Sequence, residues 1–118
     1  MFDHIGLRVR DLDKAARLYA AMLAPLGHVP GARERSYAGF GPDGRPALWL
    51  HLSKEAGGSH VALKAPSRAA VDRFHEEGRK AGAQDNGKPG LRTDYAPNYY
   101  AAFLTDLDGN NIEAVCMT

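Results

Sequence analysis

The chain has 118 residues, of which 44% are hydrophobic and 25% charged, and a formal net charge of +1 from 15 Lys and Arg against 14 Asp and Glu. These values predict one globular domain, and they argue against nucleic-acid or membrane partners, which are recognised through a strong charge field. The single cysteine, Cys116, excludes an intrachain disulfide. The N-terminus does not resemble a leader, and no apolar run reaches about 18 residues. We therefore expect a cytoplasmic protein that binds small molecules.

The first half of the chain predicts a strand, a helix and then a pair of strands. Its opening residues alternate between apolar and polar side chains, which is the period of a strand. Asp11 is a helix-capping residue, and the apolar residues after it follow one helical stripe until Pro25 and Gly27 end the helix. The turn signature at 42–44 then joins two short strands. The predicted elements are a strand over 2–9, a helix over 11–23 and strands over 36–41 and 47–52.

The second half repeats this order after Gly57 and Gly58. A second alternating strand is followed by Ser67, which caps a helix that Gly82 ends. Residues 84–95 are rich in loop formers and predict a partly extended segment. The closing pair of strands is joined by the sequence Asp-Gly-Asn-Asn, whose residues accept positive φ at low cost. The predicted elements are a strand over 60–65, a helix whose buried stripe is Val71, Phe74, Gly78 and Ala81, and strands over 99–104 and 111–116.

The two halves also resemble each other in sequence, which is typical of an internal repeat. The segment "DHIGLRVRDLDKAARLY" from Asp3 aligns with "SHVALKAPSRAAVDRFH" from Ser59, so that His4 pairs with His60. We therefore expect an α+β fold of two paired β-α-β-β-β units within a single domain, 1–118. Unit one covers about 1–55 and unit two about 59–118, and the second strand of each unit has the weakest pattern.

Glu113 lies in the middle of a predicted apolar strand, where burying an unpaired carboxylate would be costly. A helix covers one face of each sheet, so the other face must pack elsewhere or line a cavity. Strand alternation then turns His4, His60 and Glu113 toward that inner side, and we expect them to converge there. Such a set suits a divalent ion of Fe, Mn, Ni, Co or Zn.

A histidine on a strand is more often a hydrogen-bonded structural residue than a ligand, so only the convergence on Glu113 favours a metal site. His28 follows the end of a helix, and His75 lies among charged residues of a helix. Both are expected to be solvated. Cys116 is expected to be a packed, unreactive thiol.

Three segments, "DHIGLRVRDL", "SHVALKAP" and "DLDGNNIEAVC", resemble the marker segments of the vicinal oxygen chelate superfamily, which includes glyoxalase I, extradiol dioxygenases, fosfomycin-resistance enzymes and bleomycin-resistance proteins. The resemblance covers nearly the whole chain. It implies sheets curled around a cavity and places His4, His60 and Glu113 at metal-ligand positions. His51 falls near the position of a fourth ligand, usually a carboxylate in glyoxalase I, and this departure argues against glyoxalase I activity itself. A one-residue shift of register would turn His51 to the opposite face.

We expect a metal-dependent enzyme of the lyase, isomerase or dioxygenase kind, which binds a small oxygenated or electrophilic substrate on the ion. Arg8 is the candidate contact for a substrate anion, and Trp49 with one of Tyr99 or Tyr100 is expected to form apolar walls. Strand alternation lets only one of these two tyrosines face the cavity. The alternatives are a bleomycin-resistance-like protein that binds a ligand without metal, and an interaction domain whose inner face is closed core.

The connection between the units, 54–59, is short and favours units that lie side by side. The inner faces would then be completed by a second chain across a two-fold axis, the usual soluble arrangement. We therefore expect a homodimer with two equivalent sites.

Overall fold

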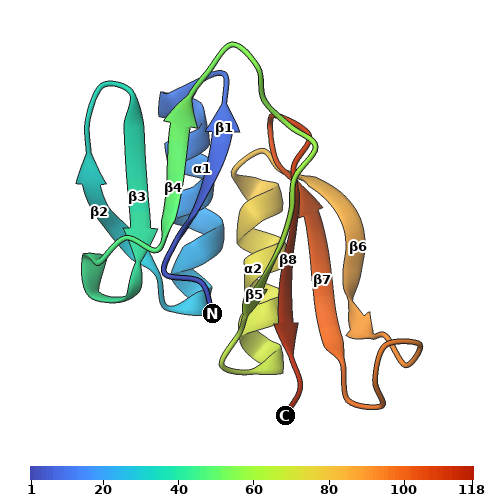
Figure 1. Ribbon diagram of the computed structural model, residues 1–118. Helices are drawn as coiled ribbons and strands as arrows, with labels where there is room; N and C mark the ends of the chain where they lie inside the picture. The colour runs from blue at the N-terminus through green and yellow to red at the C-terminus, as the bar shows by residue number, and fades with distance from the viewer.

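The computed structural model describes residues 1–43 and 45–118 in full and the backbone of Gly44. Two units of the same construction lie side by side (Figure 1). Unit one comprises β1 (Ile5–Val9), α1 (Leu12–Leu23), the 3-10 turn η1 (Ala24–Leu26), β2 (Val29–Arg33), β3 (Tyr37–Gly41), η2 (Pro42–Gly44) and β4 (Leu48–Leu52). Unit two comprises β5 (His60–Lys64), α2 (Arg68–Lys80), β6 (Gln84–Leu91), β7 (Tyr100–Thr105) and β8 (Asn111–Cys116).

Over the described residues, each unit forms a four-stranded sheet of the same topology. The strand orders are β1-β4-β3-β2 and β5-β8-β7-β6, with the first and last strands of each unit parallel and the remaining pairs antiparallel. The predicted α+β class and the β-α-β-β-β order are confirmed. The matching topology also agrees with the sequence repeat.

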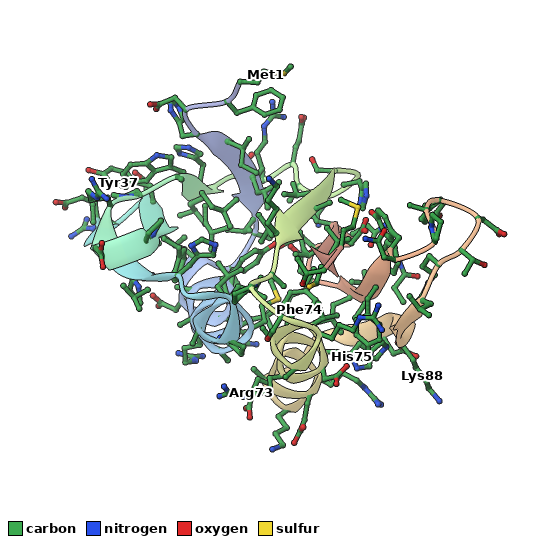
Figure 2. All side chains as sticks on the ribbon, turned by 90° about the horizontal axis from the view of Figure 1, so that it is seen from below. Met1, Tyr37, Arg73, Phe74, His75 and Lys88 are labelled. Atoms are coloured by element: carbon green, nitrogen blue, oxygen red, sulfur yellow. The ribbon has the colours of Figure 1, made fainter. Side chains whose placement is uncertain are left out.

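Both helices lie on the same side of the two sheets and enclose the core with them (Figure 2). The buried residues of α1 are Leu12, Ala15, Leu18, Tyr19, Met22 and Leu23, which include the apolar stripe that the sequence predicts. In α2, Phe74 is buried beneath the sheet while its neighbour Arg73 points away (Figure 2). The prediction that Ala81 is buried is wrong, because α2 ends at Lys80 and Ala81 is its C-cap.

A glycine permits the close contact of the two units. A Cβ built on Gly78 of α2 would lie 2.3 Å from Cδ1 of Leu104 and 3.2 Å from Cβ of Met22 in α1. Both distances are shorter than ordinary van der Waals contact, so a larger residue would force α2 away from α1 or from β7.

Polar contacts also fix the units side by side. The backbone N–H of Arg10 donates to Oδ1 of Asp108 at 3.0 Å, and its guanidinium donates to the carbonyl of Ala56 at 3.1 Å. The chain measures 42 × 27 × 26 Å. Its two sheets do not close on each other. The face of each sheet opposite the helices is left open.

The second strand of each unit is an edge strand, which explains its weak sequence pattern. β6 has register shifts on both sides of Gly87, so apolar and polar residues do not alternate along it. β1 begins at Ile5, three residues later than the predicted start. No helix among the described residues is long and apolar enough to span a membrane.

Candidate functional site

The open faces carry most of the predicted site residues. We call the open face of the first sheet the inner face of unit one, and that of the second sheet the inner face of unit two. The first presents His4, Arg8, Tyr37, Trp49 and His51, and the second presents His60, Tyr99, Phe103 and Glu113.

His60 and Glu113 form the closest pair of candidate ligands. They lie on the adjacent strands β5 and β8, where His60 pairs with Asn111 and Glu113 is two residues farther along. Nε2 of His60 is 3.2 Å from Oε1 of Glu113. The Glu113 side chain is 4% exposed, whereas that of His60 is 51% exposed. The exposed imidazole of His60 thus lies between the open face and the buried carboxylate of Glu113.

The surroundings of the His60 ring fit a cation. Nδ1 lies 3.0 Å from the backbone carbonyl of Asn111, an acceptor that requires an N–H on this nitrogen. A neutral imidazole has only one N–H, so Nε2 then presents a lone pair to the carboxylate of Glu113. Two electron-rich atoms 3.2 Å apart require a proton or a metal ion between them. A carbonyl that fixes the tautomer of a ligating histidine is a usual companion of metal sites.

Tyr99 and Tyr100 point to opposite sides of their sheet. The hydroxyl of Tyr99 donates to Oε2 of Glu113 on the inner face. Burial, followed by this hydrogen bond, raises the pKa of Tyr99 to about 12. The hydroxyl of Tyr100 instead donates to Asp72 of α2 at 2.5 Å, so Tyr100 belongs to the helix side and does not line the inner face. As expected from strand alternation, only one tyrosine of the pair faces inward, and it is Tyr99.

The ring of Phe103, which the sequence patterns did not single out, packs beside His60. Phe103 stacks on the imidazole with ring centroids 6.4 Å apart and an interplanar angle of 22°. Arg92 lies over the Phe103 ring, with Cζ 5.4 Å from its centroid. Phe103 is opposite Glu113 in the β7–β8 register. Counting in steps of two from Tyr99 along β7 would have identified Phe103 from the sequence.

On the inner face of unit one, His4, Tyr37, Trp49 and His51 line a hollow of about 280 Å³. Nδ1 of His4 is 2.7 Å from the carboxylate of Asp3, and both side chains are exposed. The His51 ring lies over Gly6, where a Cβ would be 3.2 Å from its Nε2. His51 therefore shares a face with His4 and Trp49, as the sequence predicts.

Arg8 is the cationic member of this inner face. It lies opposite His51 in the β1–β4 register and lines a polar hollow of about 450 Å³ with Glu55 and Ser59. The side chain is exposed to solvent. Its guanidinium can therefore reach an anionic group of a bound molecule.

Within one chain, the predicted ligands are divided between the two sheets. His4 and His51 belong to the first sheet, whereas His60 and Glu113 belong to the second. Among the described residues, no three His, Cys, Asp or Glu side chains form a group that could hold a metal ion. The structure does not bring His4 together with His60 and Glu113 in such a group, so their convergence on one metal ion stays a prediction. His4 and His60 both line a hollow of about 410 Å³ at the seam between β1 and β5.

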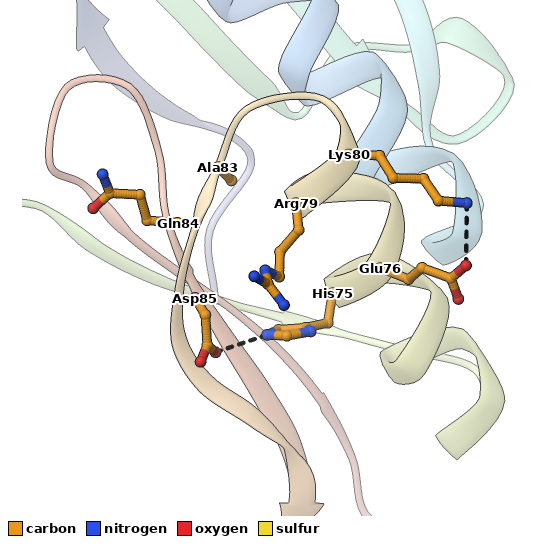
Figure 3. Close-up of a pocket in the computed structure, with 7 residues that line it drawn as sticks. All are labelled: His75, Glu76, Arg79, Lys80, Ala83, Gln84 and Asp85. Atoms are coloured by element: carbon orange, nitrogen blue, oxygen red, sulfur yellow. Dashed lines mark hydrogen bonds and ion pairs between the residues drawn. The ribbon is translucent and has the colours of Figure 1, made fainter.

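Two further histidines lie outside the inner faces. His75 is buried, and its Nε2 is 2.8 Å from Oδ1 of Asp85 (Figure 3). The expectation that His75 is solvated is wrong, because β6 brings Asp85 alongside α2. His28 is half-buried, its Nδ1 has no partner among the described residues, and burial lowers its pKa. Cys116 is buried as expected.

Comparisons with known proteins agree with this fold. The family model of the Glyoxalase/Bleomycin resistance protein/Dioxygenase superfamily matches residues 1–114. A glyoxalase/bleomycin resistance protein from Albidiferax ferrireducens T118 is 31% identical, covers 98% of this chain and 97% of its own, and has a TM-score of 0.83. A glyoxalase/bleomycin resistance protein/dioxygenase family enzyme from Burkholderia phytofirmans PsJN is 14% identical over 98% of each chain, with a TM-score of 0.75.

A glyoxalase-related enzyme from Fulvimarina pelagi is 20% identical over 98% of this chain and 86% of its own, with a TM-score of 0.74. These last two likenesses concern the fold alone. A search of curated proteins gave no match. The family-model match and the Albidiferax relative together identify the chain as a member of the Glyoxalase/Bleomycin resistance protein/Dioxygenase superfamily.

Proposed function

We propose that the chain is a metal-dependent enzyme that acts on a small oxygenated or electrophilic substrate, and that two chains complete each site. His60 and Glu113 of one chain supply part of the ligand set. His4 of the other chain supplies a further ligand, with His51 next to it. The reaction class is that of a lyase, isomerase or dioxygenase.

The observation that carries this proposal is the contact between His60 and Glu113. The imidazole faces a carbonyl at Nδ1 and a buried carboxylate at Nε2, at distances of 3.0 and 3.2 Å. This nitrogen and oxygen are the donor types that bind Fe, Mn, Ni, Co and Zn ions. The carboxylate is largely shielded from water, so little bulk solvent would compete with a bound cation for it.

A second chain would supply the missing ligands. Both inner faces are open, and large apolar residues are exposed on the chain, among them Phe2 at 79% and Tyr95 at 67%. The two units share one topology, and a two-fold axis that pairs unit one of each chain with unit two of the other would bring their inner faces together. His4 and His51 would then face His60 and Glu113.

A divalent ion held by these residues would bind two neighbouring oxygens of a substrate and stabilise negative charge that develops on them. The side chains around it divide the remaining tasks. Arg8 is positioned to pair with an anionic group of the substrate. Trp49 and Tyr37, in edge contact with ring centroids 5.6 Å apart, form an apolar wall that excludes water. Tyr99 keeps its proton on the hydroxyl oxygen near neutral pH, because its pKa is about 12.

Isothermal titration calorimetry of tag-free, metal-free protein with Mn(II), Co(II), Ni(II) and Zn(II) tests the proposal. We expect saturable binding that Glu113→Gln and His60→Ala each weaken about tenfold or more, as loss of one ligand in a small set does. Glu76→Gln, on the exposed side of α2, is the matched control and should bind as the unaltered protein does. Absence of saturable binding by the unaltered protein would overturn the enzyme proposal and favour a protein that sequesters a small ligand without metal.

A further inference from the structure

We propose that Tyr99 is a positioning residue that makes Glu113 bind an ion through a single carboxylate oxygen, Oε1. The inference rests on the metal site proposed above and concerns how that site is shaped. Tyr99 would touch neither the ion nor the substrate. It would act only through the carboxylate.

The two oxygens of Glu113 have different partners. Oε2 accepts the hydrogen bond of the Tyr99 hydroxyl, while Oε1 is 3.2 Å from Nε2 of His60. A free carboxylate can bind a metal ion through one oxygen or through both. Because the side chain is 4% exposed, water cannot easily take the place of the tyrosine hydroxyl. The hydrogen bond therefore withdraws Oε2 from coordination and leaves Oε1 on the side of His60.

The backbone holds Tyr99 in place for this task. Its N–H donates to the carbonyl of Ala96 at 3.2 Å, and its carbonyl accepts from the N–H of Arg92 at 2.7 Å. The ring packs edge-on against Tyr95, with centroids 5.1 Å apart and an interplanar angle of 76°. Hydrogen bonds within the segment 92–99 thus fix its shape and hold the Tyr99 hydroxyl against the carboxylate of Glu113.

The start of this segment is anchored to the end of β6. The guanidinium of Arg92 donates to the carbonyls of Gly90 and Lys88, at 2.9 and 2.6 Å. The same group lies over Phe103, the ring that stacks on His60. The segment that positions Glu113 through Tyr99 therefore also supports the ring beside His60.

Tyr99→Phe removes the hydroxyl and keeps the ring, so it frees Oε2 with little change of packing. We expect the visible absorption spectrum of the Co(II)-loaded protein to change, because a two-oxygen carboxylate alters the coordination number. We also expect Co(II) affinity to fall about tenfold, as when a partner of a ligand is removed. Two controls remove the same atom nearby: Tyr95→Phe, in the same segment, and Tyr100→Phe, whose hydroxyl bonds to Asp72 on the helix side. Both should keep the spectrum and affinity of the unaltered protein.

A double-variant cycle separates positioning from a general structural effect. If Tyr99 acts through the carboxylate, Tyr99→Phe should cost much less Co(II) affinity in the Glu113→Gln background than in the unaltered protein. Equal losses in both backgrounds, or a Tyr99→Phe spectrum identical to that of the unaltered protein, would overturn the positioning role and leave the metal site standing. Failure of the unaltered protein to bind Co(II) would overturn both. The metal-free variants are checked by thermal unfolding. Should Tyr99→Phe not fold, Tyr99→Leu, which also lacks the hydroxyl donor and adds no metal ligand, takes its place in the cycle, with the same expected changes.

Discussion

The hydroxyl of Tyr19 in α1 donates a hydrogen bond of 2.5 Å to Oδ2 of Asp106, at the start of the turn between β7 and β8. Both groups are buried, and they belong to different units. Asp106 also accepts from the backbone N–H groups of Asp108 and Asn110. Asn111, which follows, provides the carbonyl opposite Nδ1 of His60. The contact between units thus also fixes the turn from which the candidate site is built.

Tyr19→Phe should therefore destabilise the protein although it keeps the ring. The change leaves a buried carboxylate with one donor fewer, which costs about 1–3 kcal/mol of unfolding free energy. Urea denaturation followed by circular dichroism measures the loss. Tyr37→Phe is the control, because the Tyr37 ring is only half-buried and packs on Trp49. Equal stability of the two variants would show that the Tyr19 bond contributes nothing beyond the ring.

The pair of His75 and Asp85 predicts a dependence of stability on acid. The hydrogen bond from His75, and then that from the N–H of Gly87, lowers the pKa of Asp85 below its usual value. Because the folded-state pKa is below the unfolded one, the stabilisation is complete above about pH 4 and is lost as the pH falls through the folded-state pKa.

The variant Asp85→Asn should have a lower unfolding free energy at pH 7 and a shallower decline of stability in acid. The control is Asp94→Asn, at an exposed position in the segment between β6 and β7. Urea denaturation at a series of pH values between neutral and strongly acid measures both slopes. Parallel slopes for Asp85→Asn and the unaltered protein would contradict the prediction.

Much of the fold follows from local patterns in the sequence. Because side chains alternate along a strand, His60 and Glu113 lie on the face opposite Ile112. Asp11 and Ser67 both cap helices as predicted. These features depend on neighbours along the chain. They are therefore accessible from one sequence.

The placement of the two sheets depends on contacts between distant residues. Tyr19 bonds to Asp106, and Gly78 lets α2 approach Met22. The residues next to Tyr19 and Gly78 in the sequence do not indicate which distant residue each one contacts. For this reason the sequence indicated which residues lie on the inner faces but could not show how far apart the two faces are. The bond from Tyr99 to Glu113 was inaccessible for the same reason, since alternation gives the side of a residue and not its partner.

The open inner faces predict a homodimer. Two chains would cover these faces mutually, so we expect a mass twice that of the 12.8 kDa chain across a wide range of protein concentration. Multi-angle light scattering after size-exclusion chromatography measures it. Trp49→Glu, on the inner face of unit one, should shift the mass toward one chain, whereas Glu76→Lys, on the outer side of α2, should not. A stable mass of one chain for the unaltered protein would contradict a site shared between chains.

In the proposed site, His60 and Glu113 of one chain hold a divalent ion together with a histidine of a second chain. X-ray diffraction at the cobalt absorption edge, from crystals grown with Co(II), tests this arrangement. We expect an anomalous peak between Nε2 of His60 and Oε1 of Glu113, within bonding distance of both and of His4 or His51 of the second chain. A cobalt peak elsewhere on the protein, or none between these two atoms in fully loaded crystals, would contradict it.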